Sequence, residues 1–171
     1  SLSPKAKHSD FRTSIARFFL DNNFKIVPKP MDGDCFFHSL TGGLPAEFNI
    51  DSNNLRRIVV DTVTDKELIE WGGIFTKLIE TINSKASSKL EKANAREAIK
   101  DFKHLEGVVS LEDLKRNMMN KRIFWANDWA ISTSQFILNV KVIILDVRNY
   151  DTNPQNAIKC DLDARKNVTK C

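Results

Sequence analysis

The residues best suited to chemistry lie in one short segment, Pro30 to Leu40, with Cys35 at its centre. An Asp-Gly-Asp turn follows the prolines, and the apolar residues after the cysteine have helical spacing. This pattern predicts a strand, a turn in which Gly33 permits an unusual backbone angle, and a helix with Cys35 in its first turn. The positive end of a helix and its unpaired N–H groups stabilise an anion, whether a thiolate or the oxyanion of an attacked carbonyl. The segment therefore suits acyl transfer by a thiol.

Each of these side chains also has an interpretation without chemistry. An isolated cysteine is more often a buried apolar residue than a nucleophile. Asp32 and Asp34 could simply orient the loop by accepting backbone hydrogen bonds. His38 lies three positions after Cys35 on the same predicted helix and is poorly placed to reach the sulfur, so we expect it to have a structural role.

Residues 32–38, Asp-Gly-Asp-Cys-Phe-Phe-His, resemble at all seven positions the signature of the ovarian-tumour (OTU) deubiquitinases, Asp-Gly-Asn/Asp-Cys-Leu/Phe-Phe/Tyr-Arg/His. Leu55-Arg56 and Val59 resemble the helix that follows the signature in that family. Residues 124–131 are similar to the family's Trp-Gly-x-x-x-Glu/Ala-Ile segment, and the apolar run 140–146 falls where the family has a strand. The resemblance is strongest to OTU domains of large DNA viruses.

The resemblance implies a papain-like cysteine protease that cleaves isopeptide or peptide bonds after the C-terminal glycine of ubiquitin. The expected fold is α+β and helix-rich, with a small central sheet between helical lobes. The expected partners are ubiquitin or polyubiquitin chains, and no cofactor or metal is implied.

The same resemblance assigns roles to individual residues. Cys35 would be the nucleophile and Asp32 the acid that shapes the oxyanion loop. Gly33 and Asp34 complete that loop, with the backbone N–H groups of Asp34 and Cys35 as oxyanion donors. A second pair would line the substrate channel, with a core role as the alternative: Trp125 and Asp128.

The position of the general base is empty. A thiol protease needs an imidazole to maintain the thiolate and to protonate the leaving amine. The chain has only His8, His38 and His104, whereas the family places this histidine near the C-terminal end of the domain. We expect residues 1–171 to be a single OTU-like domain that lacks its C-terminal strand and catalytic histidine. Two alternatives remain: His8 serves as the base from the N-terminus, or the chain binds ubiquitin without catalysis.

Composition limits the classes of protein. The 171 residues are 42% hydrophobic and 28% charged, which fits one globular domain. No apolar run approaches the roughly 20 residues of a membrane span, and no export signal is present, so we expect no membrane partner and an intracellular, cytoplasmic protein, in the host cell if viral. Three cysteines without a close pair predict neither a disulfide framework nor a zinc ribbon. The net charge of +4 comes without a Lys/Arg block interleaved with aromatics, so nucleic acid is not an expected partner.

The periodicity predicts the other elements. Residues 140–146 are β-branched and nearly continuous, which favours a central, buried strand. Residues 85–105 are charged and Ala-rich, which favours an exposed helix, either with a docking stripe or as a solvated face that binds nothing. His104, at its end, is expected to be a cation suited to the helix C-terminus. Helices are also predicted over residues 10–21, 53–65, 66–83, 111–120 and 128–138, with a short strand over 24–27.

Overall fold

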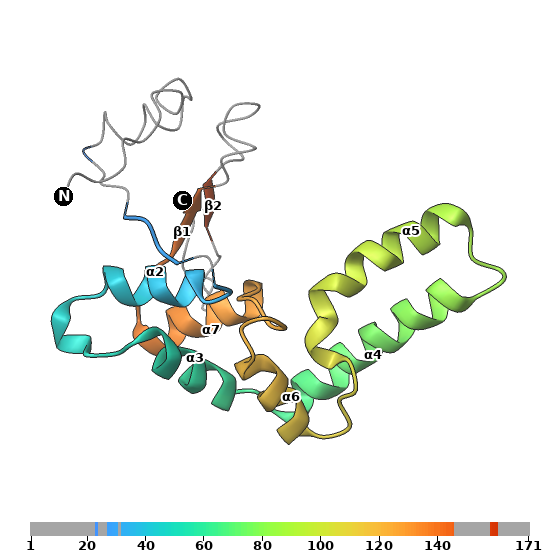
Figure 1. Ribbon diagram of the computed structural model, residues 1–171, viewed down its shortest axis with the longest axis horizontal. Coiled ribbons are helices and arrows are strands. Elements are labelled where there is room, and N and C mark those ends of the chain that lie inside the picture. The colour runs from blue at the N-terminus through green and yellow to red at the C-terminus, as the bar shows by residue number, and fades with distance from the viewer. Residues whose placement is uncertain (1–22, 24–26, 31, 146–157, 161–171) are drawn as a thin grey trace. The chain divides into compact units, whose positions relative to one another are not determined.

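The computed structural model describes residues 23, 27–30, 32–145 and 158–160 (Figure 1). The predicted helix over 10–21 and most of the predicted strand over 24–27 lie outside these ranges. Residues 29–137 form one compact unit, and the described residues from 138 onward belong to a second. The single OTU-like domain stays a prediction.

Helices make up almost all regular structure in the described part of residues 29–137. In chain order they are α2 (Cys35–Gly43), η2 (Ala46–Phe48), α3 (Ser52–Asp61), α4 (Asp65–Asn83), α5 (Lys89–Ala98), η3 (Ile99–Leu105), α6 (Leu111–Met119) and α7 (Asp128–Leu138), where η marks a 3₁₀ helix. The predicted helices over 111–120 and 128–138 are confirmed as α6 and α7. None of the helices that the structure describes has both the length and the apolar character needed to cross a membrane.

Side chains at the helix starts explain where several helices begin. Ser88 and Glu91 form a reciprocal capping box at α5: the backbone N–H of Ser88 donates to the Glu91 carboxylate at 2.7 Å, and the N–H of Glu91 donates to the Ser88 hydroxyl at 3.2 Å. Thr64 and Glu67 form the same arrangement at α4. Ser110 accepts from the N–H of Asp113 at α6, as the Ser-x-x-Asp pattern predicts.

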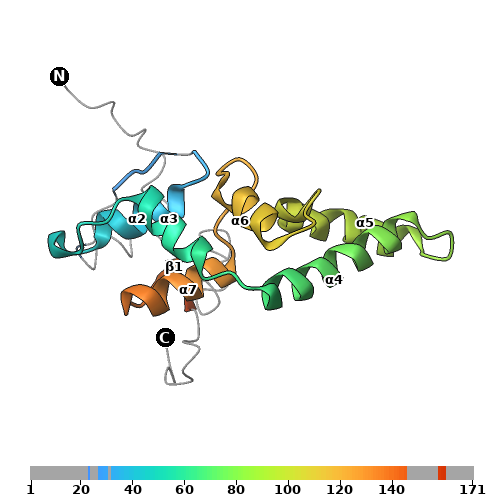
Figure 2. The ribbon, with the colours of Figure 1, turned by 90° about the horizontal axis from the view of Figure 1, so that it is seen from below.

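Helices α4 and α5 pack against each other as a hairpin, and they lie side by side in both views (Figures 1 and 2). α4 continues through Gly72-Gly73 because a glycine weakens a helix by only about 1 kcal/mol and the capping box offsets part of that cost. The hairpin contributes little to the core: α4 has no buried residue, and Ala95 is the buried residue of α5.

The core of residues 29–137 forms where α2, α3 and α6 meet the segment before α7. Phe37, Leu55, Val59, Leu114 and Met118 are each fully buried. Their positions on three helices show that α2 is fixed by packing against α3, and α3 by packing against α6. This core therefore supports the helix that begins at Cys35.

Beside this core, aromatic rings surround His104. The imidazole is 1% exposed and contacts the rings of Phe124 at 4.9 Å and Trp71 at 5.7 Å between centroids. Its Nε2 atom has no hydrogen-bond partner. The prediction that His104 is a cation suited to an exposed helix end is wrong, because burial lowers its pKa to about 4 and the neutral ring packs as an aromatic side chain.

The described strands do not form the predicted sheet. β1 (Ile143–Leu145) pairs antiparallel with β2 (Ile158–Cys160), in the register Ile143 to Cys160 and Leu145 to Ile158. Ile143 is 61% exposed, so the prediction of a central, buried strand over 140–146 is wrong for this position. A two-stranded antiparallel ribbon leaves one face open, which a run of β-branched residues does not reveal.

The expected papain-like α+β fold with a small central sheet between helical lobes is therefore contradicted. The described residues carry six α-helices, and their only strands are the two three-residue strands of this ribbon. The apolar runs that indicated strands were short, and short runs do not specify how many neighbours a strand has.

The burial of His104 predicts a pH-dependent stability. Its folded-state pKa of about 4 lies below the value of 6.5 for a free imidazole, so the unfolded chain binds the proton more readily between these values. The contribution of the neutral His104 to the free energy of unfolding should be complete above about pH 6.5. As the pH is lowered toward 4, the free energy of unfolding should fall by up to about 3 kcal/mol. Urea denaturation followed by circular dichroism between pH 5 and 7 measures this slope.

His104→Phe is the matched variant, because phenylalanine keeps an aromatic ring in the cluster but does not titrate. Its unfolding free energy should vary less over this pH window. An unchanged slope would show that His104 does not cause the dependence.

Candidate active site

Arg56, on α3, holds the loop that carries Cys35. Its guanidinium is 1% exposed, and its Nε donates to Asp34 Oδ1 at 2.6 Å. Its Nη2 donates to the carbonyl of Gly33 at 3.0 Å. Its Nη1 donates to the carbonyls of Met118 at 2.7 Å and Phe124 at 3.0 Å. One buried cation therefore joins the loop before α2 to the end of α6 and to the segment before α7.

Gly33 permits the tight turn of this loop, as the sequence predicts. Its φ is +85°, a backbone conformation in which a residue with a side chain would be strained. A Cβ at this position would lie 1.9 Å from the carbonyl oxygen of Lys121. The absence of a side chain thus lets the loop approach the segment after α6.

Asp32 forms the outer edge of the loop. Its Oδ1 accepts from the backbone N–H of Asp34 at 3.0 Å, and its Oδ2 lies 2.8 Å from Lys121 Nζ. The hydrogen bond from Lys121, and then that from the Asp34 N–H, hold the pKa of Asp32 well below its usual range. The same ion pair raises the pKa of Lys121. Asp32 therefore remains a carboxylate that shapes the loop.

Cys35 is exposed in the first turn of α2, where the sequence placed it. Asp34 is the N-cap residue, yet its side chain makes no capping hydrogen bond. Since Arg56 holds this carboxylate, it does not cover the first-turn N–H groups of α2. The exposed Cys35 thiol therefore lies at the N-terminus of a helix that no side chain caps.

Of the two predicted oxyanion donors, the backbone N–H groups of Asp34 and Cys35, one already donates a hydrogen bond within the loop. The N–H of Asp34 is engaged by Asp32, so it is not available in this arrangement. The N–H of Cys35 belongs to the first turn, whose N–H groups have no partner inside a helix. First-turn donors of α2, rather than Asp34, are therefore the groups that could face an oxyanion.

Neither of the two described histidines makes a hydrogen bond to the thiol. His38 Nε2 lies 3.4 Å from Asp32 Oδ2, and His104 is buried among aromatic rings. His8, the third candidate base, lies outside the described residues. The described part of the chain therefore assigns no imidazole to Cys35.

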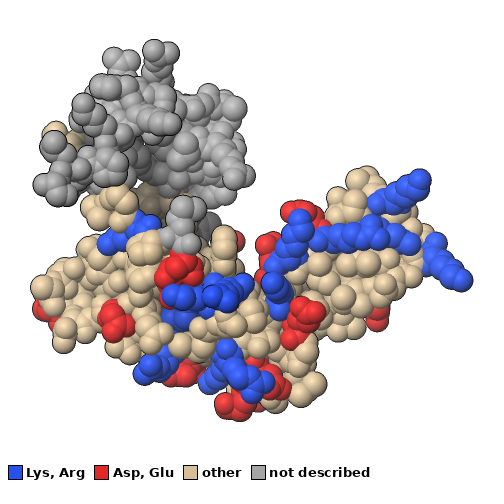
Figure 3. All heavy atoms as spheres, in the orientation of Figure 1, with Lys and Arg blue, Asp and Glu red and all other residues tan. Residues whose placement is uncertain are grey.

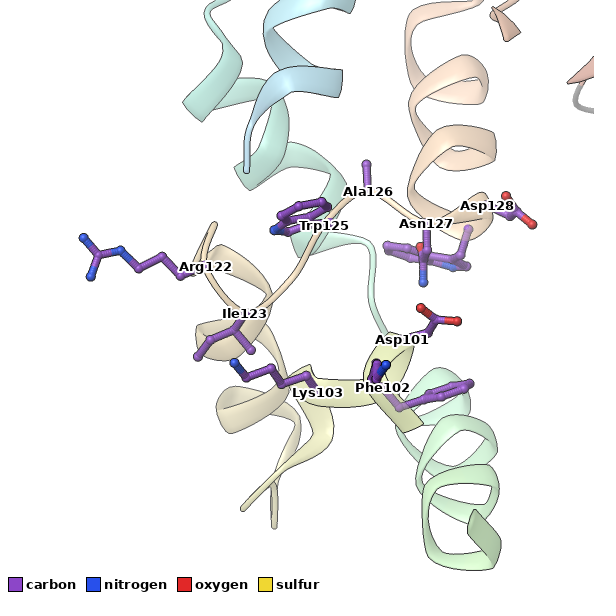
Figure 4. Close-up of a pocket in the computed structure, with 11 residues that line it drawn as sticks. Asp101, Phe102, Lys103, Arg122, Ile123, Trp125, Ala126, Asn127 and Asp128 are labelled. Atoms are coloured by element: carbon purple, nitrogen blue, oxygen red, sulfur yellow. The ribbon is translucent and has the colours of Figure 1, made fainter. Parts of the chain in front are cut away.

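Trp125 and Asp128 line a pocket of about 690 Å³ between η3 and the segment before α7 (Figure 4). Trp125 is 69% exposed, which excludes a core role for it. Cys35 is not among the lining residues, so the predicted substrate channel beside the thiol is not evident in this pocket. Arg122 lines this pocket and also a second one, of about 620 Å³, that includes Asp32 and His38.

Asp32, Asp34 and His38 offer ligand atoms within 4.8 Å of one another, a spacing that could hold a metal ion. Two of the three are already paired with cations, Asp32 with Lys121 and Asp34 with Arg56. These fixed positive charges oppose a bound metal cation, so we assign the cluster to loop structure.

Sequence reasoning missed the roles of Arg56 and Lys121. The available signal for Arg56 was an arginine among the apolar positions Leu55, Val59 and Val60 of an amphipathic helix, since an arginine on a buried face needs several partners. Lys121 gave no such signal, because its partner Asp32 lies 89 residues earlier in the chain.

Comparisons of the chain with protein-family profiles, with curated proteins and with solved structures found no match.

The Arg56 network predicts a large difference between neighbouring arginines. Arg56→Ala leaves the Asp34 carboxylate and three carbonyls without their donor and should lower the free energy of unfolding by about 3–5 kcal/mol. Arg56→Lys should recover only part of this, because an ammonium cannot reproduce the planar fork. Arg57→Ala, at an exposed position, should change it by no more than about 0.5 kcal/mol. Urea denaturation measures the free energy of unfolding of all three variants. An equal decrease in Arg56→Ala and Arg57→Ala would contradict the network.

The loop geometry predicts a second contrast, between two glycines. Gly33→Ala should lower the free energy of unfolding by at least about 1–3 kcal/mol, because of the positive φ and the contact with Lys121. Gly43→Ala, at the end of α2 where an added Cβ meets nothing, should be neutral or slightly stabilising. Thermal unfolding of the two variants decides this, and a neutral result at Gly33 would contradict the turn.

Proposed function

We propose that this protein is a thiol-dependent hydrolase of ubiquitin conjugates, with Cys35 as its nucleophile. The observation that carries the proposal is the exposed Cys35 thiol in the first turn of a helix whose N-cap carboxylate is held by Arg56. The seven-residue resemblance of the segment 32–38 to the OTU signature supplies the substrate class. The proposal rests on this local arrangement and on that signature, not on a papain-like fold.

The chemistry follows from the arrangement of the loop. The Cys35 thiolate attacks the carbonyl carbon of the C-terminal glycine of ubiquitin, and the first-turn N–H groups of α2 donate to the oxyanion. Collapse of this intermediate expels the amine, which takes a proton, and leaves a thioester on Cys35. Water then hydrolyses the thioester, releasing the glycine carboxylate and restoring the thiol. The proton is carried by an imidazole other than those of His38, which pairs with Asp32, and His104, which is buried.

A ubiquitin-binding module without catalysis is the second candidate. Its specific support is that His38 faces Asp32 and His104 is buried, so neither described imidazole is placed to act on the thiol. Such a module would bind ubiquitin as well as the hydrolase does, but Cys35 would not form a thioester.

Labelling by ubiquitin that carries an electrophile at its C-terminus tests the proposal. The protein should form a covalent adduct, and Cys35→Ala should abolish it, while Cys160→Ala and Cys171→Ala should leave the rate within about twofold. Peptide mapping should place the adduct on Cys35. Binding of unmodified ubiquitin, measured in parallel by calorimetry, should persist in Cys35→Ala.

The pattern of failure distinguishes the two candidates. Binding without an adduct would leave only the module without catalysis. Neither binding nor an adduct would overturn both. If an adduct forms, His8→Ala tests His8 as the base: the variant should lose labelling near neutral pH and regain rate as the pH rises and the thiol ionises without help. His38→Gln is the control and should keep its labelling rate near neutral pH, because His38 pairs with Asp32.

A further inference from the structure

We propose that the basic face of α5 and η3, together with the aromatic pocket next to it, binds single-stranded nucleic acid. Cys35 is not among the residues that line this pocket or form the basic face. The inference stands on the periodicity of the cations, on the composition of the pocket and on the two lysines that belong to both, Lys100 and Lys103.

The cations form one stripe along α5 and η3. The basic stripe consists of Lys89, Lys92, Arg96, Lys100 and Lys103, which follow one another at intervals of three or four residues. Lys89, Lys92 and Arg96 lie at these intervals within α5 and share a helix face, so they present about one cation per turn, roughly every 5 Å. Lys100 and Lys103 follow in η3, whose backbone kinks at Phe102, and both line the pocket. Figure 3 shows Lys and Arg side chains in a row over the part of the molecule that α5 occupies. Four of the five are exposed and Lys92 is half-buried.

The two glutamates of α5 do not cancel this stripe. Glu91 points its carboxylate at the N-cap, where it accepts from the N–H of Ser88. Glu97 pairs with Lys100 at 2.5 Å, but both side chains are largely exposed, and such pairs are weak and screened by salt. A linear polyanion can therefore compete for the stripe.

The stripe leads into the aromatic pocket, because Lys100 and Lys103 belong to both. Phe102, Trp125 and Trp129 line the pocket with aromatic side chains. Figure 4 shows Trp125, from the segment before α7, across an open space from Lys103 of η3, whereas the side chain of Arg122 points away from that space. A row of phosphate-binding cations beside stacking surfaces is the arrangement that single strands use.

Two of the aromatic residues that line the pocket are held in place by contacts with rings behind them. Trp129 meets Trp71 edge-to-face at 5.3 Å, and Trp71 in turn contacts the buried His104. Phe102 stacks near the same imidazole at 6.3 Å. Trp125 is left 69% exposed at the mouth, so it is the ring available to a base.

The carboxylates of the pocket favour a base over an acidic polypeptide. Asp101 and Asp128 line it and would repel the side chains of Glu or Asp. A nucleobase instead brings amino N–H donors, which carboxylates accept. A single strand could therefore place its phosphates on the cations of the basic stripe and its bases against the carboxylates and rings of the pocket.

Fluorescence anisotropy with a labelled oligothymidine and an oligoadenine of about 12 nucleotides, as DNA and as RNA, tests the proposal. If five cations each meet a phosphate, log K should fall with log salt with a slope of about −3.5, from about −0.7 for each contact. Lys92→Gln with Arg96→Gln should reduce the slope by about 1.4. Lys66→Gln with Lys77→Gln, two exposed lysines of α4, is the matched control and should leave it unchanged.

Trp125→Ala separates stacking from charge. It should weaken binding roughly tenfold with little change in the salt slope, because a ring makes no phosphate contact. Cys35→Ala should bind like the unaltered protein, so the outcome is independent of the hydrolase proposal.

Four results would overturn the inference. They are an absence of binding at low salt, equal effects of the α4 and α5 double variants, equal affinity for an abasic strand of the same length, and equal affinity for polyglutamate. The last would identify the stripe as a site for an acidic polypeptide instead.

Discussion

The buried guanidinium of Arg56 is the constraint on which the thiol site depends. A charge that is 1% exposed is tolerated only when its donors are satisfied, and Arg56 meets this condition with Asp34 and three backbone carbonyls. These partners come from three separate segments, so the cation fixes their mutual positions. It also draws the Asp34 carboxylate away from the N-terminus of α2, which leaves the first turn beside Cys35 without a side-chain cap.

The segment between α6 and α7 connects this site to the aromatic pocket. Its first residues contact the Cys35 loop, where the Lys121 carbonyl faces Gly33 and the Lys121 ammonium binds Asp32. Its later residues turn toward η3, with Phe124 against His104 and Trp125 at the pocket mouth. One short stretch therefore contributes to both surfaces.

The helices were largely predictable because their signals are local. The Ser110 cap and the apolar spacing that follows it lie within a few residues of α6, and the same holds for α7. The sheet was not predictable, since pairing partners are remote in sequence and a short β-branched run fits a central strand and a two-stranded ribbon equally well. The basic stripe was overlooked for a related reason: its cations alternate with acids along the chain, and only helical periodicity separates Lys89, Lys92 and Arg96 from Glu91 and Glu97.

The sequence by itself determined the Cys35 turn, the need for a glycine at position 33 and the helix that carries the thiol, because these depend on neighbouring residues and their backbone preferences. Only the tertiary structure decided that Arg56 holds Asp34, that Lys121 neutralises Asp32 and that His104 is buried as a neutral ring. Each of these depends on which remote groups are brought within about 3 Å for a hydrogen bond, or close enough to exclude water, and no local pattern specifies that.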